Sequence, residues 1–67
     1  MDALERRQEI AELLRKNERP ISALFLSEKF DVPGEIIAQD ILDLIESGED
    51  ILFQNSGYFI RQEKVLD

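Results

Sequence analysis

The side chains in this sequence that could take part in acid–base chemistry are mostly carboxylates. The chain has 15 aspartate and glutamate residues, 8 lysine and arginine residues, no histidine and no cysteine. Without histidine and cysteine, the usual zinc sites, thiol nucleophiles, disulfides and imidazole catalysis are excluded. Asp40 and Asp43 are available as acids, but no nucleophile or base accompanies them. We therefore expect no enzymatic activity, no metal and no cofactor.

Length and charge restrict the remaining functions. A chain of 67 residues makes one small domain, residues 1–67, with room for one core and no deep cleft. We expect no small-molecule site in it. No apolar run approaches the roughly 20 residues of a membrane span, and the N-terminal segment lacks a signal-peptide core, so we expect a cytoplasmic domain without membrane contact. The net charge of −7 argues against wrapping nucleic acid by bulk electrostatics, although it permits a local basic patch.

Residues 20–48 form the central segment of the chain, and we expect the remaining residues to pack against it or to flank it. We predict a helix from about residue 23 to residue 30, a turn at 31–33 and a second helix that starts at Gly34. The apolar residues of the second helix recur at helical spacing and are Ile36, Ile37, Ile41, Leu44 and Ile45. Gly48 ends this helix, as a glycine in a left-handed cap commonly does. A short helix, a tight turn and a longer helix form the helix-turn-helix pattern, which is usually met in nucleic-acid readers.

A further helix is predicted before this pair. Asp2 is its expected N-cap, and the helix runs over residues 3–16. Its apolar stripe consists of Leu4, Ile10, Ala11, Leu13 and Leu14. Arg6 and Arg7 in its first turn oppose the helix dipole, so these two cations need another reason to be there.

The C-terminal part of the chain predicts a β-hairpin. Two β-prone runs at about residues 51–54 and 58–61 are separated by a turn cluster at 55–57. The turn register decides which face each apolar strand residue occupies. Ile21 and Ser22, before the helix-turn-helix segment, could add a very short first strand.

Residues along most of the chain carry a family resemblance. They are Arg7, Ile10, Leu13, Leu14, Pro20, Ile21, Ser22, Leu26, Ser27, Phe30, Val32, Gln39, Asp40, Ile41, Gly48, Ile51, Gly57 and Tyr58. Together they resemble the small winged helix at the N-terminus of the biotin repressor and niacin-responsive repressor families, with the deoxyribonucleoside-repressor type as a looser relative. The resemblance implies an α+β winged helix-turn-helix fold of three helices and a β-hairpin wing. It also implies that the third helix docks in the DNA major groove, that the wing reaches the backbone or minor groove, and that a downstream domain binds a ligand or dimerises.

The sequence departs from this family pattern at the positions that read DNA. Where the family typically opens its third helix with Ser, Arg and Gln, this chain has Pro33, Gly34 and Glu35, and Ser56 stands at the wing tip in place of a common Arg. The third helix has no base and four acids, which are Glu35, Asp40, Asp43 and Glu46. The loss of an arginine removes the usual partner of guanine, and carboxylates meet phosphate repulsion. We therefore expect DNA binding to be weakened.

Apolar residues stand at four positions where the family pattern has polar, basic or smaller ones. These residues are Leu24, Phe25, Ile45 and Phe53. Either they belong to the core, because small cores tolerate changes in packing, or they form an exposed patch of the kind that marks a protein interface. They are our candidate protein-interface residues.

A second set of side chains could still contact DNA phosphates or bases. These candidates are Arg19, Lys29, Gln39, Asn55, Ser56 and Arg61. Gln39 could bond an adenine or, equally, cap a neighbouring backbone group. The single basic residues are of the kind that is more often simply solvated.

Two functions follow from these observations. In the first, the chain is the winged-helix module of a transcription regulator that works largely through contact with a protein partner or a homodimer mate, with DNA binding secondary. In the second, it is a direct sequence-specific DNA-binding repressor domain, whose basic surface comes from the first helix, the flank of the wing and a dimer mate.

Overall fold

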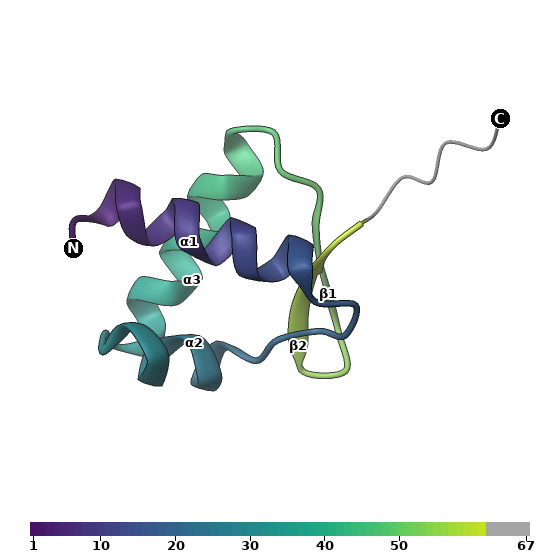
Figure 1. The fold of residues 1–67 in the computed structure, drawn as a ribbon, viewed down its shortest axis with the longest axis horizontal. Helices are drawn as coiled ribbons and strands as arrows, with labels where there is room; N and C mark the ends of the chain where they lie inside the picture. Colours follow the sequence, from purple (N-terminus) through teal and green to yellow (C-terminus); the bar gives the residue numbers. More distant parts are fainter. Residues whose placement is uncertain (62–67) are drawn as a thin grey trace, which may run out of the picture.

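The computed structural model describes residues 1–61 as three helices followed by a two-stranded antiparallel hairpin (Figure 1). The elements are α1 (Ala3–Lys16), α2 (Ala23–Phe30), α3 (Gly34–Glu46), β1 (Ile51–Gln54) and β2 (Gly57–Ile60). This arrangement confirms the predicted α+β winged helix, although β2 starts and ends one residue earlier than predicted. Residues 62–67 of the predicted domain lie outside the described part. Within residues 1–61, no helix has the length and apolar character needed to cross a membrane.

Short polar side chains begin the first two helices. At α1, Asp2 Oδ1 accepts a hydrogen bond from the Glu5 amide at 2.8 Å, and the Glu5 carboxylate accepts one from the Asp2 amide at 3.3 Å. This reciprocal pair is a capping box, and it confirms Asp2 as the N-cap. At α2, Ser22 Oγ accepts a hydrogen bond from the Phe25 amide at 3.0 Å. Ser22 is therefore a helix cap and not a strand residue.

Helices α2 and α3 are each terminated by a residue whose backbone has a positive φ, in the left-handed conformation. Asp31, with φ of 55°, stops α2 and lets the chain turn towards α3 within three residues. Gly48 has φ of 109°, and the amide of the next residue, Glu49, donates to the Leu44 carbonyl at 3.0 Å. This is the glycine cap that the sequence predicts for α3.

A two-residue turn sets the register of the hairpin. Asn55 and Ser56 have φ of 53° and 61°, as a type I′ turn requires. The strand partners are Ile51 and Ile60, Leu52 and Phe59, Phe53 and Tyr58, and Gln54 and Gly57. Residues directly opposite each other share a face, so both isoleucines, the tyrosine and Phe53 point to the same side. The isoleucines are buried, whereas Phe53, nearer the tip, is 65% exposed.

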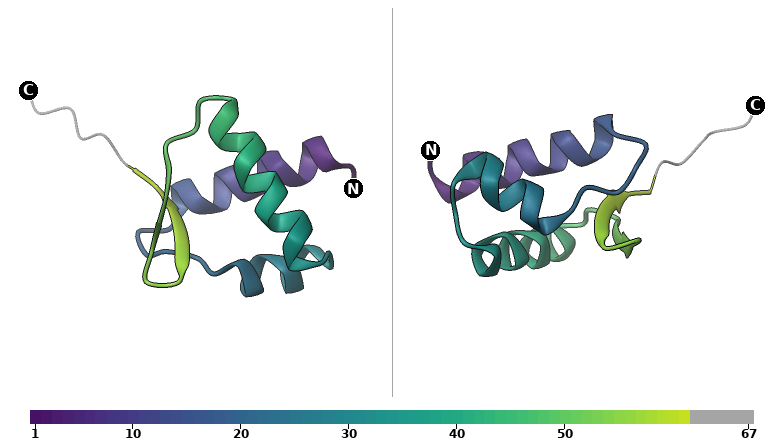
Figure 2. Two further views of the ribbon diagram at one scale, coloured as in Figure 1. Left: turned by 180° about the vertical axis from the view of Figure 1, so that it is seen from behind. Right: turned by 90° about the horizontal axis from the view of Figure 1, so that it is seen from below.

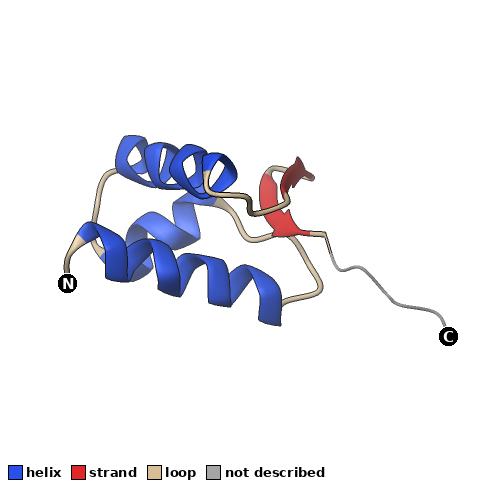
Figure 3. Cartoon of the chain, turned by 90° about the horizontal axis from the view of Figure 1, so that it is seen from above, coloured by secondary structure: helices blue, strands red, loops and turns tan. Residues whose placement is uncertain are grey.

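The loop between α1 and α2 holds the wing against the helices. Ile21 forms an antiparallel bridge with Tyr58, with N···O distances of 2.8 Å in both directions. The predicted short first strand is thus a single bridge residue. A Cβ on Gly57 would lie 2.8 Å from Pro20 Cβ, so only glycine permits this close approach. Figure 3 shows the helices grouped together with the hairpin beside them.

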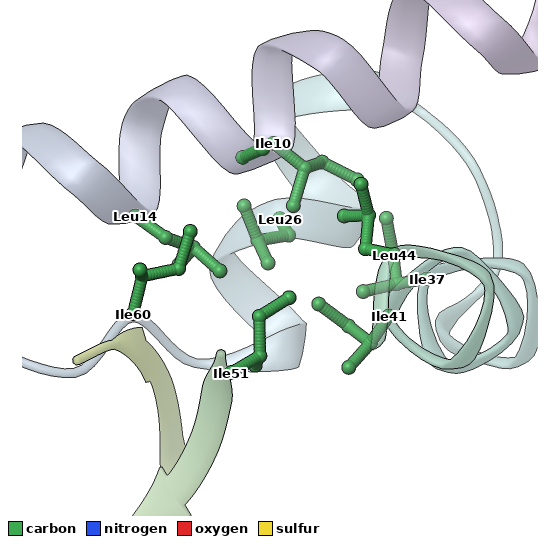
Figure 4. Packing of buried hydrophobic residues seen from close by; sticks show 9 residues of the cluster. Ile10, Leu14, Leu26, Ile37, Ile41, Leu44, Ile51 and Ile60 are labelled. Atoms are coloured by element: carbon green, nitrogen blue, oxygen red, sulfur yellow. The ribbon is translucent and has the colours of Figure 1, made fainter. Parts of the chain in front are cut away.

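Apolar side chains from all three helices and both strands form one core (Figure 4). Its buried members are Ile10, Ala11, Leu14, Leu26, Ile37, Ile41, Leu44, Ile51 and Ile60. The predicted stripe of α1 is correct except at Leu4, which is exposed, and Leu13 packs at the edge of the core. In α3, the predicted apolar residues Ile36 and Ile45 are exposed because they lie off the buried face.

We expect Leu26→Ala to lower the free energy of unfolding by about 2–5 kcal/mol, because it empties a fully buried position. Leu24→Ala in the same helix is the matched control, because the Leu24 side chain is 67% exposed. Its expected change is within about 0.5 kcal/mol. Urea unfolding followed by circular dichroism measures both variants, and equal losses would contradict this packing.

Candidate functional site

Helix α3 lies across α1, with one side on the core and the other in solvent (Figure 2). Its exposed residues are Gly34, Glu35, Ile36, Ala38, Gln39, Leu42, Ile45 and Glu46. None of these residues is basic. The outward side of α3 therefore offers carboxylates, one amide and apolar groups to any partner.

A buried ion pair joins α3 to the start of α1. Asp40 is only 2% exposed, and its two oxygens accept hydrogen bonds from Arg6: Nε lies 2.5 Å from Oδ2, and Nη2 lies 3.0 Å from Oδ1. This two-point geometry is the strongest form of an arginine–carboxylate pair. The hydrogen bond to Asp40 raises the pKa of the Arg6 guanidinium, with burial acting in the opposite direction, so Arg6 remains charged at physiological pH.

Arg7 extends this pair into a cluster of four charges. Its Nη1 lies 3.7 Å from Asp40 Oδ1 and 3.6 Å from Asp43 Oδ2. Asp43 Oδ1 also accepts a hydrogen bond from Gln39 Nε2 at 3.0 Å. The cluster of Arg6, Arg7, Asp40 and Asp43 is neutral as a whole. It supplies the reason for two cations near the N-terminus of α1, where the helix dipole alone disfavours them.

This cluster corrects part of the expectation that the carboxylates of α3 repel DNA phosphates. Asp40 is buried, and Asp43 is half-buried beside Arg7. Glu35 and Glu46 are the acids of α3 that remain exposed. The outward side is thus less acidic than the sequence suggests, but it gains no cation in exchange.

The predicted DNA-contact residues on α3 and the wing are exposed. Gln39 bonds the Asp43 side chain one turn away, which is neither of the two roles considered for it. Asn55 and Ser56 form the turn at the tip of the wing. These uncharged side chains can approach a nucleic acid but cannot neutralise its phosphates.

The predicted basic contacts are exposed and are not gathered beside α3. Arg19 lies in the loop after α1, and Lys29 lies near the end of α2, where it lines a hollow with residues of α1. Arg61 follows β2, and its Nε lies 3.3 Å from an Asp50 carboxylate oxygen. Among the described lysine and arginine residues, only Arg19 and Lys29 have no carboxylate partner.

The predicted protein-interface residues are all exposed, but they fall into separate groups. Leu24 and Phe25 lie at the start of α2, where Phe25 lines a hollow with Leu13 of α1. Ile45 lies on α3, and Phe53 lies on β1. The exposure of all four residues removes the alternative that they belong to the core.

Sequence reasoning missed Leu42, which is 54% exposed on α3. The signal was available in the spacing: Ala38, Leu42 and Ile45 form a second apolar series beside the buried one. Residues four and three apart lie on the same side of a helix. Helix α3 therefore has an apolar series on its solvent side as well as on its core side.

We expect Arg6→Met to lower the free energy of unfolding by about 3 kcal/mol, because it leaves the buried Asp40 carboxylate with only the more distant Arg7. Adding Asp40→Leu should recover part of that loss, because no buried charge remains. Arg61→Met, which breaks an exposed pair, is the control and should cost less than about 1 kcal/mol. Thermal and urea unfolding give these values. A double variant that is less stable than Arg6→Met alone would contradict the buried pairing.

Comparison with known proteins agrees with this geometry. No curated protein is similar enough to the chain to count as a match. A protein-family model described as an HTH domain matches residues 6–59, which reach from the start of α1 into β2. The matched stretch includes the α2–α3 pair, the core of the fold and most of the wing. The chain therefore belongs to this helix-turn-helix domain family.

Proposed function

We propose that this domain is the helix-turn-helix module of a transcription regulator whose outward α3 side works mainly through contact with another protein. One observation carries the proposal: the exposed residues of α3 include no cation but do include Leu42 and Ile45. Large apolar side chains on a surface are typical of protein interfaces. Direct reading of DNA is then a secondary property.

The distribution of charge supports this proposal. Binding to DNA depends on lysine and arginine side chains that neutralise phosphates and release counterions. Here most of the described cations already have carboxylate partners, and the two that have none, Arg19 and Lys29, are not on α3. The net charge of −7 adds a general repulsion between the domain and a duplex.

Direct DNA binding is the second candidate, and family membership favours it. Helix-turn-helix domains commonly place their second helix in the major groove. In this chain that helix is α3, with Gln39 exposed at its middle. The finer resemblance to the biotin and niacin-responsive repressors points in the same direction. Such a domain would need a basic surface from Arg19, Lys29 or a dimer mate.

We expect the domain not to bind mixed-sequence duplex DNA detectably at about 50 mM salt. Fluorescence anisotropy of a labelled duplex, repeated over a range of salt concentrations, measures this binding. The matched variant is Glu35→Lys with Glu46→Lys, which reverses both exposed charges of α3. This variant should bind more tightly than the wild type and lose affinity as salt rises. Salt-sensitive binding by the wild type that the two substitutions do not strengthen would contradict the proposal and favour direct DNA reading through another surface.

A further inference from the structure

One flank of α3 is apolar and uncovered. Ala38, Leu42 and Ile45 are all exposed, with exposed fractions of 54% for Leu42 and 44% for Ile45. Their spacings of four and three residues place them in a row along the helix. We call these three residues the α3 stripe. It is separate from the row of Ile37, Ile41 and Leu44, which is buried in the core.

The stripe lies on the flank of α3 opposite to the ion cluster. Asp40 and Asp43 point towards Arg6 and Arg7 near the N-terminus of α1. Figure 2 shows that the N-terminus of α1 and the hairpin lie on opposite sides of α3. The stripe therefore turns towards the hairpin side. There Phe53 is exposed, on the strand face that turns towards the helices.

The surroundings of the stripe carry negative charge. Glu35 and Glu46 are exposed near the two ends of α3. Neither α3 nor the hairpin strands contain a lysine or arginine. Arg61, which follows β2, is paired with Asp50. An apolar row bordered by acids at both ends matches a partner that has apolar residues flanked by bases.

We propose that the α3 stripe binds an amphipathic, basic helical segment of another protein. This inference rests on the proposed function, because it names the partner of the same surface. The 13 residues of α3 extend over about 20 Å, which is the length of about four turns of a partner helix. Apolar side chains of the partner cover Leu42, Ile45 and Phe53, and its lysine or arginine side chains lie near Glu35 and Glu46.

Repulsion between like charges disfavours binding of a second copy of this chain to the α3 stripe. Antiparallel pairing of two α3 helices along the stripe places the Glu35 end of one copy beside the Glu46 end of the other. Parallel pairing places each glutamate beside its own counterpart. Like charges oppose association in both cases, and each copy carries a net charge of −7.

The test uses two synthetic helical peptides of about 14 residues, long enough to lie along α3. One is built from leucine and lysine, and the other has glutamate at every lysine position. Each is titrated into the isotopically labelled domain, and amide chemical shifts report affinity and location. We expect the leucine–lysine peptide to bind at least tenfold more tightly and to shift amides of α3 and β1.

Two variants and one further peptide locate the site. Leu42→Ser combined with Ile45→Ser should weaken binding of the leucine–lysine peptide at least tenfold. Leu4→Ser removes a similarly exposed leucine from α1, outside every candidate site, and should leave the affinity unchanged. Circular dichroism confirms that each variant is folded. An oligolysine peptide, which has charge without apolar residues, should bind at least tenfold more weakly than the leucine–lysine peptide.

The alternative outcomes separate this inference from the proposed function. Equal binding of the acidic peptide at α3 overturns the basic partner but leaves protein contact in place. A dimer of the wild type that Leu42→Ser with Ile45→Ser abolishes likewise overturns the basic partner in favour of a second copy. Binding of neither peptide, or binding that the α3 substitutions do not change, overturns the inference. Duplex DNA that shifts the α3 amides in a salt-sensitive manner overturns the proposed function itself.

Discussion

The ion pair between Arg6 and Asp40 is the constraint on which the orientation of α3 depends. Asp40 is buried, and a buried carboxylate is costly unless it is paired and hydrogen-bonded. Arg6 is the residue that satisfies it on both oxygens. The helix must therefore keep Asp40 turned towards α1. Because side chains on a helix are fixed relative to one another, this requirement also determines which residues of α3 point to solvent.

The outward side of α3 follows from that rotation. With Ile37, Ile41 and Leu44 on the core and Asp40 on α1, the positions left for solvent include Glu35, Gln39, Leu42, Ile45 and Glu46. The capping box of α1, the serine cap of α2, the left-handed caps and the hairpin turn fix where the elements begin and end, but they do not decide which residues of α3 are exposed. The same helix-turn-helix frame can carry a DNA-reading surface or a protein-binding one, because function depends on the exposed residues and not on the fold. Under our proposal, those residues contact an apolar, basic partner and not a phosphate backbone.

Local patterns in the sequence were sufficient to predict most of the fold. The bounds of α1 and α2 and the start of α3 follow from apolar periodicity, from Asp2 as a cap and from the turn before Gly34. The hairpin also follows from its two β-prone runs, whereas its register does not. The register depends on positive φ at both Asn55 and Ser56, and serine is not among the residues that usually signal such a turn.

The candidate site was less accessible to sequence reasoning. An aspartate in the middle of a helix usually lies in solvent, so nothing local marks Asp40 as buried. Its partner is 34 residues away, and only the packing of α3 on α1 brings the two together. The clue was the unexplained presence of Arg6 and Arg7 near the start of α1. Leu42 lies outside the helically spaced apolar series by which the core face was predicted, and that series does not show which other apolar residues are exposed.

The sign of the electrostatic potential over α3 is the quantity on which the account depends most directly. It can be measured as the relaxation that positively and negatively charged paramagnetic cosolutes of the same shape cause at individual amide protons. The account predicts stronger relaxation by the cationic cosolute at Glu35, Gln39, Leu42 and Glu46. Stronger relaxation by the anionic cosolute at these amides would mean that α3 presents a positive surface, as a DNA-reading helix does, and would contradict the assignment of this side of the domain to protein contact.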